Sequence, residues 1–111
     1  MKLEVGMHVR FNNGDIGKIA NYEYREEYTN GYVIYLEKDE TIGWCCEEKD
    51  FKASYNIIDL IEVGDYVNGF PVIHKENDIL KCGLLVQFKE NEIKSIVTKE
   101  QMEQMEYKVG E

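Results

Sequence analysis

Residues 5–19 read Val5-Gly6-Met7-His8-Val9-Arg10-Phe11-Asn12-Asn13-Gly14-Asp15-Ile16-Gly17-Lys18-Ile19, and this stretch decides the fold. Short apolar alternations flank the turn signal Asn13-Gly14. Gly14 can adopt the positive φ that a tight turn needs, and Gly17 lets the second strand bend sharply or bulge. The stretch therefore predicts a β-hairpin with one inward-facing side.

The hairpin resembles the opening of KOW and Tudor-like small barrels. In that family a first strand, a tight turn and a glycine in the second strand build a compact five-stranded, SH3-like barrel. The resemblance implies RNA contact, or docking on a polymerase or ribosome, as the usual role. Here the loops carry acids, such as Asp39 and Glu40, where nucleic-acid-binding members carry bases. The fold expectation stands, whereas the RNA expectation is weakened.

Turn signals recur along the whole chain. They are Asn13-Gly14, Asn30-Gly31, Lys38-Asp39-Glu40, Asn68-Gly69 and Glu76-Asn77-Asp78, each between short apolar or aromatic runs. Such close spacing predicts a mainly β protein. The expected strands are residues 7–12, 16–24, 31–37, 41–46, 65–67, 70–74, 79–82, 84–88, 92–97 and 106–109.

One stretch reads clearly as a helix. Residues 98–105 begin with Thr98, which can cap the N-terminus, and Gln101 occupies the third helical position of a capping box. Residues 54–61 are ambiguous, because their β-branched content favours a strand while Asn56 could start a helical turn. We favour a turn leading into a strand there.

A short pattern occurs twice. Glu4-Val5-Gly6-Met7-His8-Val9 and Glu62-Val63-Gly64-Asp65-Tyr66-Val67 share Glu-Val-Gly-x-x-Val, each close upstream of an Asn-Gly turn. The repeat predicts two tandem SH3-like (KOW/Tudor-like) small barrels. Residues 1–61 would form the first, and residues 62–111 a second, shorter barrel-like half that contains the short helix.

The charge balance restricts the class of partner. The formal net charge is −9, with 7 bases against 12 acids in residues 1–61 and 6 against 10 in residues 62–111. Nucleic-acid binders rely on Lys and Arg to displace counterions from phosphates. We therefore expect a basic protein surface as the partner, and no direct nucleic-acid ligand.

The residues that commonly carry chemistry form no familiar motif. The cysteines Cys45, Cys46 and Cys82 are predicted to be reduced and structural, and His8 and His74 lack metal-ligand spacing. With no nucleophile motif or phosphate loop, we predict no enzyme activity, no metal and no cofactor. The sequence has neither a long apolar run nor a signal-peptide core, so we expect a cytoplasmic protein and no membrane partner.

The candidate partner-binding residues surround the Asn30-Gly31 turn. Tyrosines offer large contact area with few rotors to freeze, and a barrel this small cannot bury five of them. The alternatives are that the rings only stiffen the hairpin, and that the acids are solvated charge rather than a row mimicking phosphates. The predicted site comprises Tyr22, Tyr24, Glu26, Glu27, Tyr28, Tyr32, Tyr35, Asp39 and Glu40.

Residues 56–69 and 93–102 resemble segments of small uncharacterised proteins carried by phages and prophages of Gram-positive bacteria. By analogy with such proteins, the resemblance implies an anti-CRISPR-like inhibitor whose acidic surface occupies the basic site of a nuclease or CRISPR effector. We therefore expect a mobile-element-encoded inhibitor of a nucleic-acid-handling defence enzyme, in the cytoplasm of a bacterial host cell. The alternatives are a KOW-like regulator docking on host transcription or translation machinery, and a virion assembly protein.

Overall fold

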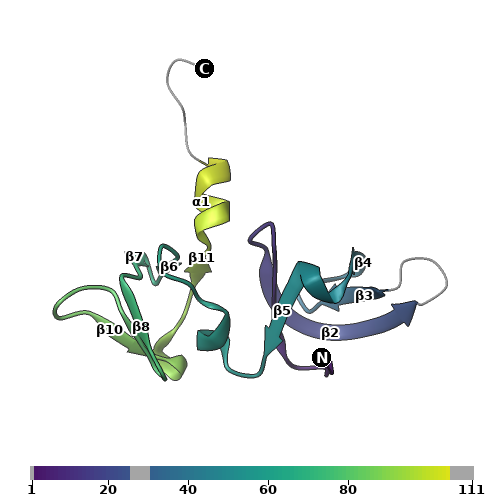
Figure 1. The fold of residues 1–111 in the computed structure, drawn as a ribbon, viewed down its shortest axis with the longest axis horizontal. Coiled ribbons are helices and arrows are strands. Elements are labelled where there is room, and N and C mark those ends of the chain that lie inside the picture. Colours follow the sequence, from purple (N-terminus) through teal and green to yellow (C-terminus); the bar gives the residue numbers. More distant parts are fainter. Residues whose placement is uncertain (1, 26–30, 106–111) are drawn as a thin grey trace, which may run out of the picture. The chain divides into compact units, whose positions relative to one another are not determined.

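The computed structural model describes residues 2–25 and 31–105. The chain divides into two compact units, Met1–Leu60 and Ile61–Glu111. Both units contain antiparallel sheets, and the α-helix of the described residues lies near the C-terminus (Figure 1). The predicted fold class, mainly β with a short helix near the C-terminus, is confirmed, and the closure of each unit into an SH3-like barrel stays a prediction.

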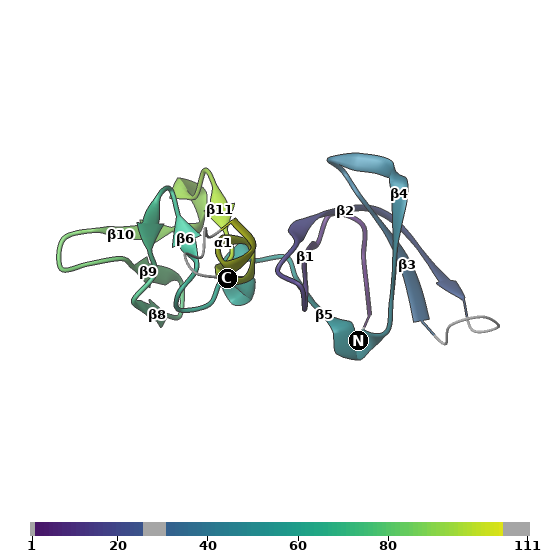
Figure 2. The same cartoon turned by 90° about the horizontal axis from the view of Figure 1, so that it is seen from above.

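The first unit contains one five-stranded sheet, in the order β4-β3-β2-β1-β5 (Figure 2). Because β5 pairs with β1, the end of the unit returns to its beginning. This pairing was not predicted, because no turn signal marks it. The strands are β1 (His8–Phe11), β2 (Ile16–Arg25), β3 (Gly31–Leu36), β4 (Asp39–Cys46) and β5 (Phe51–Ser54), and a 3-10 turn, η1 (Glu48–Asp50), joins the last two.

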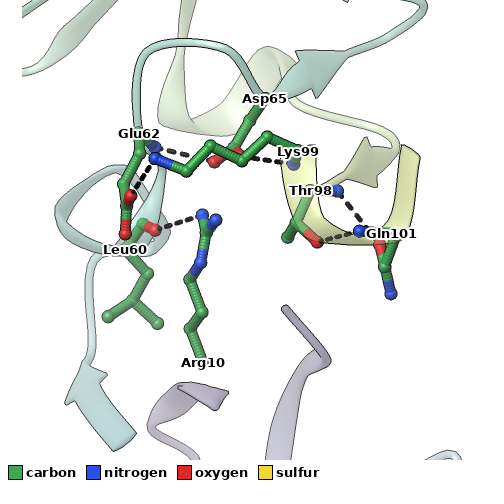
Figure 3. Close-up of polar contacts among 7 residues, drawn as sticks. All are labelled: Arg10, Leu60, Glu62, Asp65, Thr98, Lys99 and Gln101. Carbon is green, nitrogen blue, oxygen red and sulfur yellow. Dashed lines mark hydrogen bonds and ion pairs between the residues drawn. The ribbon is translucent and has the colours of Figure 1, made fainter. Parts of the chain in front are cut away.

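Apolar side chains from all five strands and from Leu3 form the core of this unit. Phe11 stacks on the half-buried Trp44, with ring centroids 4.8 Å apart. The side chain of Arg10 is also buried, at 4% exposure. Its guanidinium Nη1 donates to the backbone oxygen of Leu60 at 2.9 Å (Figure 3), so this cation is hydrogen-bonded, as a buried charge requires.

Within residues 54–61 the structure has the expected turn, but no strand follows it, so the expected strand is wrong. The side-chain oxygen of Asn56 accepts from the backbone N–H of Ile58 at 3.0 Å and opens the 3-10 turn η2 (Ile57–Leu60). Capping by Asn56 and burial of three apolar residues of this turn outweigh the β-propensity of its isoleucines.

The second unit contains two three-stranded sheets, β10-β9-β8 and β11-β6-β7. Its strands are two or three residues long, which gives each sheet few ladder hydrogen bonds. The elements are β6 (Tyr66–Val67), β7 (Phe70–Pro71), β8 (His74–Glu76), β9 (Ile79–Lys81), β10 (Gln87–Lys89), the 3-10 turn η3 (Glu90–Glu92), β11 (Ile96–Val97) and α1 (Lys99–Met105).

Three strand predictions for this unit need correction. Residues 70–74 are split between β7 and β8, and residues 92–97 form a strand only at Ile96–Val97. In residues 84–88 the apolar pattern does not produce a strand at its start, since Leu84 and Leu85 are 104% and 97% exposed in the loop before β10. The strand predicted over 106–109 lies outside the described residues.

The predicted capping of α1 is confirmed. The backbone N–H of Thr98 donates to the Gln101 side chain at 3.0 Å, and the N–H of Gln101 donates to the Thr98 hydroxyl at 3.3 Å (Figure 3). A second group holds the same helix end, because the carboxylate of Asp65 accepts from the backbone N–H groups of Glu62 and Lys99 at 2.7 and 2.9 Å. Asp65 is fully buried.

Candidate protein-binding site

Three of the predicted tyrosines meet on the core-facing side of the first sheet. In the β2–β3 ladder Tyr22 lies opposite Ile34 and Tyr24 lies opposite Tyr32, so all four side chains share one face. The ring of Tyr32 lies 5.2 Å from that of Tyr24 and 6.4 Å from that of Tyr22, measured between centroids. We call Tyr24, Tyr32 and Glu48 the tyrosine site.

The tyrosines differ in how much of each ring is available. Tyr22 is half-buried, and its hydroxyl donates to the backbone oxygen of Leu3 at 2.8 Å. Tyr32 is also half-buried and packs edge-on against Phe51 at 5.7 Å. Tyr24 is 57% exposed. A fixed inner ring therefore supports an exposed outer ring.

A carboxylate completes this end of the sheet. The hydroxyl of Tyr32 donates to Oε1 of Glu48, on η1, at 3.3 Å. Burial raises the pKa of Tyr32, and the negative charge of Glu48 raises it further, so the hydroxyl stays neutral and keeps donating at pH 7. Two tyrosine rings beside a carboxylate suit a cation such as the side chain of Lys or Arg.

Tyr35 lies on the other face of the sheet, away from the tyrosine site. Tyr35 lies opposite Gly43, and its ring occupies the space that a side chain at position 43 would need. A Cβ atom at Gly43 would lie 3.2 Å from this ring and 2.7 Å from Val33 Cγ1. On the same face Arg25 forms an ion pair with Glu23 at 2.7 Å, which raises the pKa of Arg25. A partner covering the tyrosine site would therefore not contact Tyr35.

Asp39 and Glu40 lie at the opposite end of β4 from the tyrosine site. Asp39 pairs with Leu36, whereas Tyr32 pairs with Cys46, so the two positions are about 13 Å apart along β3 at about 3.3 Å per residue. Asp39 accepts hydrogen bonds from the hydroxyl and N–H of Thr41, which lower its pKa. The remaining predicted residues, Glu26, Glu27 and Tyr28, lie outside the described residues.

Two participants were not among the predicted site residues. Glu48 belongs to none of the turn signals, and Phe51 lies outside the expected strands. A local signal for the η1 turn does exist, since Glu47 and Asp50 have capping-box spacing. The backbone N–H of Glu47 does donate to Asp50 Oδ2 at 2.9 Å.

The cysteines and histidines do not gather into a site. Cys45 is exposed, Cys46 and Cys82 are buried, and all three are free thiols. Burial raises the pKa of Cys46 to about 11. Over residues 2–25 and 31–105, no three His, Cys, Asp or Glu side chains are close enough together to hold a metal ion.

The described residues also contain no helix that is long and apolar enough to cross a membrane. The tyrosine site consists of two aromatic rings, on β2 and β3, and one carboxylate, on η1. Comparison of the chain with protein-family models, with curated proteins and with solved structures finds no match.

Proposed function

We propose that this protein is a non-catalytic binding module that holds a basic segment of a partner protein at the tyrosine site. The supporting observation is the exposed ring of Tyr24, packed on Tyr32, whose hydroxyl is bonded to Glu48. A lysine or arginine side chain can lie on the Tyr24 ring and reach the carboxylate. Cation–π contacts of this kind contribute roughly 0.5–2 kcal/mol.

The charge around the site favours the same class of partner. Residues 37–50 carry six acids and two lysines, and one of the lysines, Lys49, is paired with Glu47 at 3.3 Å. An acidic surface attracts a basic partner and speeds encounter at low ionic strength. It repels nucleic acid, whose phosphates carry the same sign of charge.

The target class that fits this chemistry is a nucleic-acid-handling enzyme. Such enzymes present cationic surfaces to phosphates, and an acidic protein bound there excludes the nucleic acid. We extend the proposal to inhibition of a defence nuclease or CRISPR effector in the bacterial cytoplasm by a protein of a mobile element. The net charge of −9 and the two phage-like segments support this extension.

The proposal is tested with a labelled arginine- and lysine-rich peptide, titrated against the wild type, Tyr24→Ala and Glu48→Gln. Tyr55→Ala is the matched control, since Tyr55 is 56% exposed and Tyr24 is 57% exposed. We expect Tyr24→Ala to weaken binding by about 2- to 30-fold, the equivalent of 0.5–2 kcal/mol. Equal losses in Tyr24→Ala and Tyr55→Ala, or tighter binding of duplex DNA than of the peptide, would refute the tyrosine site.

Capture of partners from a bacterial lysate, before and after nuclease treatment and at two salt concentrations, tests the extension. Salt-sensitive, nuclease-resistant retention of a nuclease complex, followed by loss of its activity on adding the protein, is the expected result. Retention that disappears with nuclease treatment would contradict it.

A further inference from the structure

The outer edge of β4 is an unpaired strand edge in the first unit. β4 is the terminal strand of the sheet, bonded to β3 on one side. Among the described residues, β3 is the strand that residues 40–45 pair with, and no backbone hydrogen bond joins them to a second strand. An edge of this kind presents alternating N–H and C=O groups that can pair with an added strand.

The two halves of β4 differ in how they protect this edge. Glu40, Thr41 and Ile42 have no partners on β3, because they lie between the Asp39–Leu36 and Gly43–Tyr35 pairs. This bulge blocks strand addition over the first half. Residues 43–46 pair one to one with residues 35–32 and contain no Lys, Pro or bulge, which are the usual edge-protecting devices.

Carboxylates border the open half at both ends. Asp39 and Glu40 precede it, and Glu47 and Glu48 follow it. Glu48 belongs to the tyrosine site, so the edge leads directly to that site. The charge at both ends selects an extended segment with basic residues at its two ends, and charge of this sign disfavours a second copy of the acidic edge.

The side chains beside the edge determine the middle of that segment. Trp44 is half-buried on the core face of the strand, where its ring stacks on Phe11. An apolar side chain from an added strand would cover the rest of the ring. On the other face Val33 and the ring of Tyr35 lie over Gly43, so a small residue of the added strand fits that face best.

We propose that the basic partner segment binds as an additional β-strand along residues 43–46 of β4. Main-chain hydrogen bonds provide the alignment, and the flanking carboxylates select for positive charge. This inference rests on the proposed function, because it specifies how the segment that reaches the tyrosine site is held.

The test uses a synthetic peptide of about eight residues, long enough to cover residues 43–46 and reach the carboxylates at both ends, with basic residues at its ends and alternating Val and Thr between them. Its matched control has the same sequence and charge but is N-methylated at every second residue. The backbone N–H groups along one edge of the control peptide are therefore missing and cannot donate hydrogen bonds to β4. We expect the methylated peptide to bind at least tenfold more weakly. We also expect the unmodified peptide to slow amide exchange at alternate positions of residues 43–46.

A protein variant tests the charge selection. Glu40→Gln should weaken binding of the unmodified peptide several-fold at low salt, whereas the matched change Glu103→Gln on α1 should leave it unchanged. Both side chains are exposed, so both variants should fold as the wild type does. Equal effects of the two substitutions would overturn the role of the flanking carboxylates.

The outcomes separate this inference from the proposed function. Equal binding of both peptides, with shifts at Tyr24 and Tyr32 alone, overturns strand addition and leaves the proposed function standing. If neither peptide binds, both fail. A third outcome also overturns the inference. If sedimentation shows that the protein is a dimer, and the β4 amides exchange faster when dilution separates the dimer, then the edge pairs with a second copy of the chain.

Discussion

The two copies of the Glu-Val-Gly pattern form the same turn in units of different construction. Gly6 and Gly64 have φ of +95° and +100°. Gly6 N–H donates to Ile19 O, as Gly64 N–H donates to Val72 O, both at 2.9 Å. The backbone N–H groups of Ile19 and Val72 then donate to Met7 O and Asp65 O, both at 2.8 Å.

The side chains after each glycine are used differently. In the first unit Met7 packs against the core, and the Asn13 side chain bonds to Asp15, two residues away. In the second unit Asp65 holds the start of α1. The Asn68 side chain reaches the backbone of residues 92, 94 and 95 at 2.7–3.0 Å.

The difference follows from strand length. A sheet with strands of four to ten residues supplies enough ladder hydrogen bonds and apolar contacts to hold the first unit. Strands of two or three residues do not, so side-chain to backbone bonds from the repeated motif hold the second unit. A short sequence repeat therefore specifies the local turn and leaves the tertiary attachment to the residues that differ.

The largest effect is expected from Asp65→Ala. It removes a buried carboxylate that accepts two backbone N–H groups, and should lower the free energy of unfolding of the second unit by about 3 kcal/mol. Met7→Ala, at the equivalent half-buried position, should cost about 1 kcal/mol. Amide hydrogen exchange measures the second unit, and Trp44 fluorescence in denaturant measures the first. A smaller loss in Asp65→Ala than in Met7→Ala would reverse the comparison.

Replacing the asparagines comes next. Asn68→Gly keeps the positive φ of 53° and removes three bonds to residues 92–95, so the second unit should lose about 2 kcal/mol. Asn13→Gly should cost the first unit about 1 kcal/mol. Both variants add the same backbone freedom to the unfolded chain, so the difference measures the side-chain bonds. Equal losses by hydrogen exchange would show that the bonds of Asn68 contribute nothing.

Features fixed by local chemistry could be predicted from the sequence. The Asn13-Gly14 and Asn68-Gly69 turns, the capping of α1 and the shared face of Tyr22 and Tyr24 depend on neighbouring residues alone. Pairing of β5 with β1 could not, because it joins Phe51 to Phe11 with no local signal. The contact of Glu48 with Tyr32 depends on that same return of the chain.

The Leu84-Leu85 loop shows a different limit. Its apolar residues predict a strand, yet both leucines are exposed. Hydrophobicity predicts burial only where another element can cover the side chain, and that depends on the tertiary arrangement. The separation of Asp39 from Tyr32 also depends on the arrangement of the strands. Asp39 begins β4 opposite Leu36, whereas Tyr32 lies opposite Cys46 at the other end of β4.

Adding a side chain to either turn should have equal cost in the two units. Gly6→Ala and Gly64→Ala place a Cβ at strongly positive φ, which should cost about 1–2 kcal/mol each. The new Cβ meets nothing within 4 Å at Gly6, and only the Lys99 side chain at 3.6 Å at Gly64. Backbone strain should therefore dominate in both. Losses that differ by more than about 0.5 kcal/mol would break the equivalence of the turns.

The smallest effects on stability are expected from Glu4 and Glu62, the first residues of the two copies of the Glu-Val-Gly pattern. Glu62 forms an ion pair with Lys99 at 2.7 Å, and Glu4 accepts from the hydroxyl of Tyr55. The hydrogen bond and charge of each carboxylate raise the pKa of its partner, Lys99 or Tyr55. Because both partners hold their protons more tightly when folded, each contact stabilises the protein fully below the unfolded pKa of about 10 and is lost as pH rises above it.

Glu62→Gln and Glu4→Gln test this pH dependence. With both partners of the ion pair more than a third exposed, Glu62→Gln should cost well under about 1 kcal/mol at pH 8. The difference in free energy of unfolding between wild type and each variant should shrink at pH 11. At that pH Lys99 and Tyr55 begin to lose the protons that the glutamates bind. Denaturant unfolding at the two pH values measures this difference. A difference that persists at pH 11 would mean that each glutamate acts through packing, and that the first position of the pattern, like the glycine, has a role independent of charge.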